Sequence, residues 1–398
     1  MSRQVFARVP NGVEQAPTPF TLQVSEDSIS EFRQLLALSK VGPPTWEGSQ
    51  PDGRFGVTRE WLINAKSVWL NQFNWRQFEE RINSYPNFTM NIPADDGSGE
   101  FTIHFAALFS AREDAKPVVF LHGWPGSFVE FLQILAILSS RYTPDTLPYH
   151  VVVPSLPGYT LSTGPPLDRD FTMADAGKLI HGLMMRLGFS NGYVAQGGDV
   201  GSVLAVSMSA TYEQCEAVHV NLWMEPGSSE MSGEEAHHRE LDITAARRAE
   251  SFRTTGMAYF MEHATRPSTI GLVLSSSPLA LLSWIGEKFL DWSDPRQPPS
   301  LDTILSMVSL YWFTSCFPRS IWPYRYLASP TARVSVPKTK PFGYSCFPYE
   351  ISTASESVVG ASAENLVFYA KYDRGGHFAA LEQPELLLEG VEEFIAKL

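Results

Sequence analysis

The chain has 398 residues, of which 44% are hydrophobic and 18% are charged, so it can bury a sizeable core, and a disordered chain is disfavoured. Its net charge of -13 argues against nucleic acid and anionic membrane surfaces as partners. The three cysteines (Cys215, Cys316 and Cys346) are far apart and lack metal-ligand spacing, which favours a reducing, cytoplasmic location.

Residues 1–95 are predicted to form an N-terminal region of their own. The opening "MSRQVFARVPNG" lacks the apolar segment of a signal peptide, so we expect a soluble chain without a membrane anchor. The stretch "SEDSISEFRQLLALSK" has a helical period behind a capping residue, and "TREWLINAKSVWLNQFNWRQFEERINSYPNF" places aromatic residues at helical intervals up to Pro86. We expect helices and a meander on the outside of the main domain.

From residue 96 onward, predicted strands and helices alternate. The run "KPVVFLHG" is continuously apolar, as in strands that are buried on both faces. Further strands are predicted in "FTIHFAALFS", "YHVVVPSLPGY", "GYVAQGG", "AVHVNLW" and "NLVFYAKY", and helices in "FVEFLQILAILSSR" and "MADAGKLIHGLMMRLG". This alternation predicts an α/β fold in which a mostly parallel sheet is covered on both sides. Residues 96–224 would form the first part of this core and residues 336–398 the second.

Residues 225–335 interrupt the strand rhythm with a helical insertion rich in Trp, Tyr and Met. We expect this insertion to form a lid over the carboxyl edge of the sheet, where ligands bind in open α/β sheets. Its most apolar stretch, from Ser268 to Gly286, contains Pro278 and a serine triplet, so buried helices are favoured over a membrane span.

The segment "YVAQGGDVGS" places Asp199 on a tight turn between a strand and a helix. Gly197 and Gly201 flank Asp199 at the positions where the nucleophile turn of α/β-hydrolases requires small residues. A helix-capping aspartate is the alternative interpretation. Because the strand, the glycines and the helix occur together, we interpret Asp199 as a nucleophile. A carboxylate nucleophile displaces at saturated carbon and forms an alkyl ester, which points to epoxides or alkyl halides.

Two backbone N–H groups are predicted to form an oxyanion hole for hydrolysis of that ester. One belongs to Trp124 in "FLHGWPGS", after the second buried strand, and the other to Val200, which follows the nucleophile. The alternative is a turn that needs glycine and proline for its shape alone.

His377 in "GGHFAALEQP" follows the last predicted strand, where the general base of this chain order is expected. Two carboxylates are candidates for the group that orients it. Glu350, in "GYSCFPYEIS", is favoured over Asp373, which lies on the same loop as the histidine.

With these residues in place, the sequence resembles the microsomal-type epoxide hydrolases, in particular their soluble fungal members. The resemblance covers essentially the whole chain and rests on "WRQFEERINSYPNF", "HGWPGS", "PSLPGY", "GGDVGS", "RPSTIG", "KPFGYSCFPYE" and "GGHFAALEQP". It implies an α/β-hydrolase fold with a helical lid and an N-terminal meander. It also implies that two tyrosines, Tyr259 and Tyr324, hold and protonate the epoxide oxygen, and it supports Glu350 as the acid. The family has Asp or Glu at that position.

The sequence therefore predicts an epoxide hydrolase that forms a vicinal diol without a cofactor or a metal ion. Its partners would be water and a small apolar or aryl epoxide, because the lid is rich in aromatic residues and methionine. The resemblance is also compatible with a homodimer. A haloalkane or haloacid dehalogenase is the alternative, although Val200 stands where haloalkane enzymes commonly have tryptophan. A non-catalytic binding protein is a third hypothesis.

Overall fold

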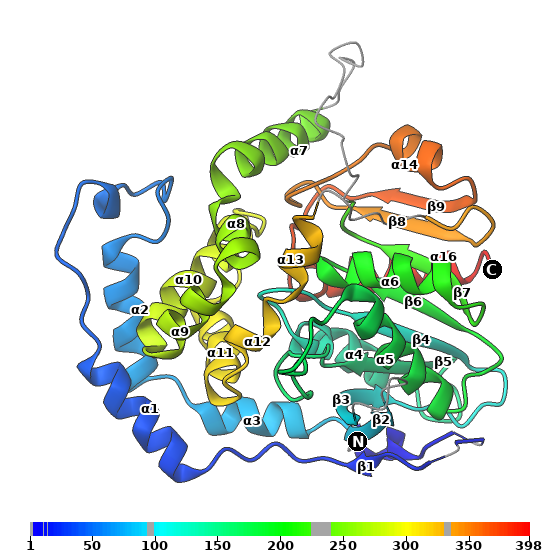
Figure 1. Ribbon diagram of the computed structural model, residues 1–398. Coiled ribbons are helices and arrows are strands. Elements are labelled where there is room, and N and C mark those ends of the chain that lie inside the picture. The colour runs from blue at the N-terminus through cyan, green and yellow to red at the C-terminus, as the bar shows by residue number, and fades with distance from the viewer. Residues whose placement is uncertain (1–2, 11, 14, 94–98, 224–239, 330–335) are drawn as a thin grey trace.

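The computed structural model describes residues 3–10, 12–13, 15–93, 99–223, 240–329 and 336–398. Within these residues, nine strands form one sheet in the order β1-β2-β3-β5-β4-β6-β7-β8-β9 (Figure 1). The pairs β1–β2, β2–β3 and β3–β5 are antiparallel, and all pairs from β5 to β9 are parallel. The strands are β1 (Thr18–Pro19), β2 (Asn87–Pro93), β3 (Glu100–Leu108), β4 (Lys116–Leu121), β5 (Tyr149–Pro154), β6 (Tyr193–Gly197), β7 (Cys215–Val220), β8 (Phe342–Cys346) and β9 (Leu366–Lys371). The predicted α/β-hydrolase fold with a mostly parallel sheet is confirmed.

The predicted strands agree with the sheet, but the prediction omitted three of its members. β4 has the continuous apolar run and lies between β5 and β6. The short strands β1 and β8 and the longer β2 were not predicted as strands, although β2 begins directly after the break at Pro86. β8, with the sequence FGYSC, is fully buried between β7 and β9, so its strand state depends on its two neighbours rather than on local pattern.

Helices cover both faces of the sheet. α5 packs on α6, which contacts β4, β6 and β7, whereas α16 packs on α4 and contacts β8 and β9 (Figure 1). α5 ends as predicted, with Gly188 at a φ of 85° just beyond the helix. The helices of the core are η3 (Phe128–Phe131), α4 (Leu132–Arg141), α5 (Met173–Arg186), α6 (Val200–Thr211), α14 (Glu356–Ser362), α15 (Ala379–Glu382) and α16 (Pro384–Ile395).

The helices α1, α2 and α3 lie mainly against the helical segment between β7 and β8, whereas η1 contacts β3 of the sheet (Figure 1). α1 contacts α10, and α2 and α3 contact α11. The indole N–H of Trp69 donates to Ser309 Oγ at 3.0 Å, and Phe32 packs on Trp69 with ring centroids 4.9 Å apart. This region contains η1 (Arg3–Ala7), α1 (Glu26–Leu38), η2 (Glu47–Ser49), α2 (Arg59–Asn71) and α3 (Trp75–Asn83).

The described parts of the segment between β7 and β8 form helices joined by turns and loops, without a strand. It contains α7 (Glu240–Ser251), η4 (Phe252–Gly256), α8 (Ala258–Thr265), α9 (Pro267–Ser275), α10 (Pro278–Asp291), α11 (Leu301–Phe313), α12 (Phe317–Ser320) and α13 (Pro323–Leu327). The predicted boundaries at 95/96, 224/225 and 335/336 fall in or at the edge of stretches outside the described residues. The four-part division of the chain therefore stays a prediction.

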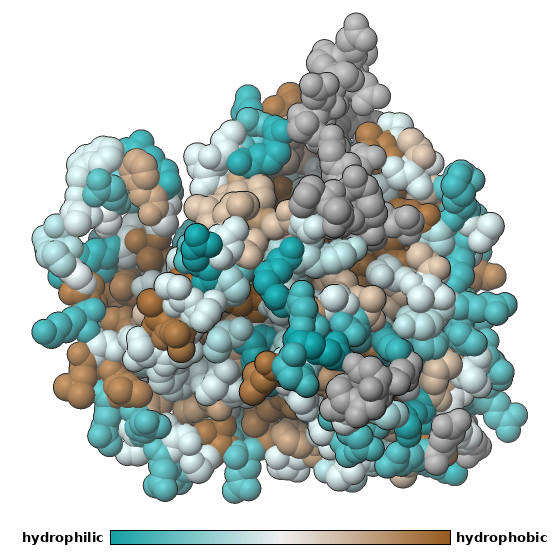
Figure 2. Space-filling model, in the orientation of Figure 1, coloured by the Kyte–Doolittle hydropathy of each residue, from teal (hydrophilic) through white to brown (hydrophobic). Residues whose placement is uncertain are grey.

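The apolar stretch of this segment forms two helices, α9 and α10. α10 is largely buried, as predicted, whereas Leu272 and Val273 of α9 are 73% and 52% exposed. On the face shown in Figure 2, hydrophobic residues reach the surface in separate patches. Among the described residues no single helix is long and apolar enough to span a membrane. α9 and α10 pass that test only as a pair, which bends by 119° at the break.

Candidate active site

Asp199 lies on the turn between β6 and α6 in a strained backbone conformation. Its φ is 49° and its ψ is -128°, values that non-glycine residues rarely adopt. The turn also brings backbone segments into contact. A Cβ atom on Gly197 would lie 2.1 Å from the carbonyl oxygen of Gly201, and one on Gly201 would lie 2.2 Å from the carbonyl oxygen of Leu121. Glycine is therefore needed at both flanking positions, as the sequence pattern suggested.

The side chain of Asp199 does not cap the helix that follows it, since it makes no capping hydrogen bond. Its Oδ1 accepts the backbone N–H of Trp124 at 2.7 Å, and its Oδ2 lies 3.4 Å from Nε2 of His377. A Cβ atom on Gly123 would lie 2.0 Å from Oδ1, so this glycine leaves room for the carboxylate. These contacts disfavour the capping alternative and bring the carboxylate together with the predicted oxyanion donor and the predicted base.

His377 and Glu350 come together from the loops after β9 and β8. His377 Nδ1 lies 2.6 Å from Oε1 of Glu350, which is fully buried and also accepts the N–H of Ile351 at 2.6 Å. The backbone N–H of His377 donates to the carbonyl of Trp292 at 3.0 Å and so anchors the loop. The side chain of Asp373, by contrast, is 76% exposed. Glu350, and not Asp373, thus occupies the position beside Nδ1.

The two carboxylates determine the protonation state of the imidazole. Burial lowers the pKa of His377, but the nearby charges and hydrogen bonds of Glu350 and Asp199 outweigh burial and raise the pKa to about 10. At neutral pH the resting protein therefore holds an imidazolium ion between two carboxylates.

Tyr259 and Tyr324, from α8 and α13, pack against each other near Asp199. Their ring centroids are 5.7 Å apart, and both side chains are buried. The ring of Trp124 stacks on Tyr259 with centroids 5.3 Å apart and lies edge-on to Tyr324 at 5.8 Å. Burial raises the pKa of both phenols well above 10, and the negative charge of Asp199 raises them further. Both hydroxyls therefore stay protonated over the whole neutral range.

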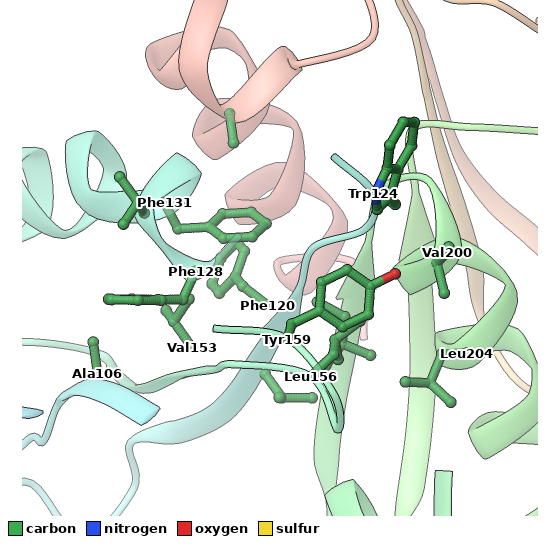
Figure 3. Packing of buried hydrophobic residues seen from close by; sticks show 14 of the residues in the cluster. Ala106, Phe120, Trp124, Phe128, Phe131, Val153, Leu156, Tyr159, Val200 and Leu204 are labelled. Carbon is green, nitrogen blue, oxygen red and sulfur yellow. The ribbon is translucent and has the colours of Figure 1, made fainter. Parts of the chain in front are cut away.

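The predicted oxyanion donors both lie next to Asp199, the predicted nucleophile. Trp124 already donates its N–H to Asp199 Oδ1 at 2.7 Å. Val200 is the first residue of α6, so its N–H has no acceptor within that helix. Figure 3 shows both residues where the loop after β4 meets the start of α6. Among the described side chains, no group of three or more His, Cys, Asp or Glu residues is arranged to hold a metal ion.

Sequence reasoning missed two polar residues beside the site. Tyr159, in "PSLPGY", is fully buried, and within the described structure its hydroxyl has no hydrogen-bond partner. In Figure 3 this hydroxyl points toward Trp124 and Val200. Glu130 is also buried, and burial raises the pKa of its carboxyl to about 8. The spacing Ser127-x-x-Glu130 is a detectable capping signal, but it does not reveal proximity to Asp199.

Comparisons with known proteins give a consistent family. The family model described as "Epoxide hydrolase N terminus" matches residues 17–131, and the one described as "alpha/beta hydrolase fold" matches residues 116–229. The solved structure of Aspergillus niger epoxide hydrolase is 47% identical in sequence, with a TM-score of 0.90, and the match covers 98% of this chain and 99% of that one.

Two more distant relatives extend the comparison. "Epoxide hydrolase 1" of Sus scrofa is 29% identical over 97% of this chain and 90% of its own length. The juvenile hormone epoxide hydrolase of Bombyx mori is 24% identical, with a TM-score of 0.79 over 96% of this chain and 95% of its own, and so shares the fold.

Proposed function

The chain belongs to the epoxide hydrolase family, and we propose that it converts its epoxide to a vicinal diol in two steps, through a covalent ester on Asp199. One observation carries this proposal: the carboxylate of Asp199 lies between the N–H of Trp124 and the imidazole of His377, below two buried phenols. Family membership also favours an epoxide over an alkyl halide as the substrate, and an enzyme over a non-catalytic binding protein.

In the first step, Asp199 opens the epoxide. Since Oδ1 is held by the N–H of Trp124 at 2.7 Å, Oδ2 is the oxygen that attacks a ring carbon. The new C–O ester bond forms as the ring C–O bond breaks, and the departing alkoxide takes a proton from Tyr259 or Tyr324. An unprotonated alkoxide is unstable where water is excluded, so it needs a proton donor. A phenol is acidic enough to give it a proton, and both phenols are protonated before the ring opens.

In the second step, His377 becomes a base because the nucleophile has lost its charge. An esterified Asp199 no longer stabilises the imidazolium, so the pKa of His377 falls from its raised value and its proton passes to solvent or to the tyrosinate left by ring opening. Neutral His377, oriented by Glu350, then removes a proton from water as the water attacks the ester carbonyl. Oδ1 is now the carbonyl oxygen, and the N–H groups of Trp124 and Val200 stabilise its developing charge.

The aromatic side chains around Tyr259 favour an apolar or aryl epoxide as the substrate. Trp292 lies 5.1 Å from the ring of Tyr259, and Phe252 lies 5.9 Å from that of Trp292. Aromatic walls of this kind bind apolar groups by burial and ring stacking. We also propose that the helical segment from α7 to α13 acts as the lid, because it carries both tyrosines.

Location and assembly are separate proposals. All three cysteines are buried and free of disulfides, which is consistent with a reducing, cytoplasmic environment. A homodimer stays a prediction.

Diol formation from racemic styrene oxide tests the proposed function. Wild type should produce diol, Asp199→Ala should produce none, and Asp373→Ala should match wild type, because its carboxylate is exposed on the His377 loop. Equal diol formation by wild type and Asp199→Ala would refute Asp199 as the nucleophile.

A further inference from the structure

A small cavity of about 20 Å³ lies against the nucleophile on the side of the hydrolase core. Asp199, His377, Trp124 and Glu130 line it, and every other lining residue also comes from the core rather than from the helical segment. A volume of this size holds one water molecule, provided that polar groups surround it. This cavity, the nucleophile cavity, therefore has the size and the polarity for a single water.

The position of the cavity suits the second chemical step. The epoxide has to bind between Asp199 and the two tyrosines, so its alkyl group will lie on the lid side of the ester. Water must approach the ester carbonyl from elsewhere, within reach of the base and with the carbonyl oxygen in the oxyanion hole. The nucleophile cavity borders Asp199, His377 and Trp124, and thus meets each of these requirements.

Glu130 supplies a carboxyl group to the same cavity. Its Oε1 accepts the N–H of Ser127 at 3.1 Å in the capping box of η3, which leaves Oε2 for the cavity. A Cβ atom on Gly126 would lie 1.5 Å from Oε1, so glycine at that position makes room for the inward-turned carboxyl. A capping glutamate can serve its helix from the surface, whereas Glu130 is only 8% exposed and lies near the charge of Asp199. The cap alone does not explain this placement.

We propose that the nucleophile cavity holds the hydrolytic water and that Oε2 of Glu130, in its carboxylate form, accepts the hydrogen that this water does not give to His377. The inference rests on the proposed two-step function. The water oxygen bonds to Cγ of Asp199, one water proton moves to Nε2 of His377, and the other O–H bond points to Glu130. Collapse of the tetrahedral intermediate breaks the ester C–O bond, and the departing alkoxide takes the proton from His377 to give the diol.

Single-turnover kinetics of Glu130→Gln test this inference at a pH above about 8, where Glu130 is ionised. Gln keeps the size of the side chain and an oxygen for the N–H of Ser127, but it turns an N–H₂ donor toward the water. Ester formation should stay within about 3-fold of wild type, and ester hydrolysis should slow by about tenfold or more, as expected for losing a hydrogen bond to a reacting group. The rise and the decay of the ester-adduct population, followed by intact-protein mass spectrometry, measure the rates of the two steps.

Glu79→Gln is the matched control, since Glu79 is a buried carboxylate that accepts backbone and indole N–H groups, pairs with Arg76 and does not line the nucleophile cavity. It should change neither step. Ala380→Val, which enlarges another side chain that lines the nucleophile cavity and leaves the Glu130 carboxyl unchanged, should also slow hydrolysis selectively. Unchanged hydrolysis in Glu130→Gln, or equal slowing of both steps, would overturn the inference. An ester in His377→Gln but not in Glu130→Gln would overturn the water site alone, whereas no ester in either variant would overturn the two-step function.

Discussion

Neutralising Asp199 should lower the pKa of His377, because this shift is what turns an imidazolium into a base during the reaction. His377 Nε2 lies 3.4 Å from Asp199 Oδ2. Two unit charges at that separation interact by about 5 kcal/mol at an effective dielectric constant of about 20, which corresponds to about 3 to 4 pKa units. Glu350 remains in place, and burial opposes the charge. Asp199→Asn should therefore lower the pKa of His377 from about 10 by roughly 2 to 4 units.

Asparagine suits this experiment because it has the shape of aspartate, is uncharged like the esterified Asp199, and tolerates a positive φ. The pKa can be measured by NMR titration of protein with labelled histidine, and His377→Gln identifies the signal. Asp373→Asn is the control, since its exposed carboxylate should move the pKa little. A His377 pKa within about half a unit of wild type in Asp199→Asn would refute the electrostatic switch.

The sign of the pH effect on hydrolysis follows from this switch. The ester intermediate needs neutral His377, which forms as the pH rises through the lowered pKa. Single-turnover hydrolysis should therefore accelerate from acid pH and reach a plateau well below the value of about 10 that applies to the resting protein.

Three further variants test separate parts of the site. Glu350→Gln should slow ester hydrolysis by about 10²-fold or more while Asp373→Asn leaves it unchanged, as measured by decay of the ester mass. Tyr259→Phe and Tyr324→Phe should each slow ester formation but not ester hydrolysis, and the double variant should lose about 10²-fold or more in ester formation by stopped-flow fluorescence. Gly201→Ala should lose about 3 kcal/mol or more of stability in urea unfolding, because its Cβ would lie 2.2 Å from a carbonyl oxygen of β4.

The sequence predicted an element best where the feature that determines its structure, such as burial or a close backbone contact, also restricts the residue types in that element. The apolar run of β4 predicted a strand because that strand is buried on both faces. "GGDVG" predicted a sharp turn because backbone contacts exclude any side chain at Gly197 and Gly201. β8 was not predicted, since its five residues owe their conformation to pairing with β7 and β9.

For the candidate site, the turn pattern of "GGDVG" predicted Asp199 as the nucleophile, and chain order predicted His377 as the base. The choice between Glu350 and Asp373 depended on their distances from His377, which their sequence positions do not determine. The roles of Tyr259 and Tyr324 came from family resemblance alone, because many tyrosines occur in this chain. Glu130 was missed for a physical reason. Its importance lies in its approach to Asp199, which arises from the three-dimensional path of the loop after β4.

Trapping of the covalent ester tests the central claim most directly. His377→Gln should be incubated with an aryl epoxide, and its intact mass should rise by the mass of one epoxide, with the adduct on the peptide that contains Asp199. The double variant Asp199→Asn/His377→Gln should gain no mass. An unchanged mass of His377→Gln, or an adduct on another residue, would contradict the account.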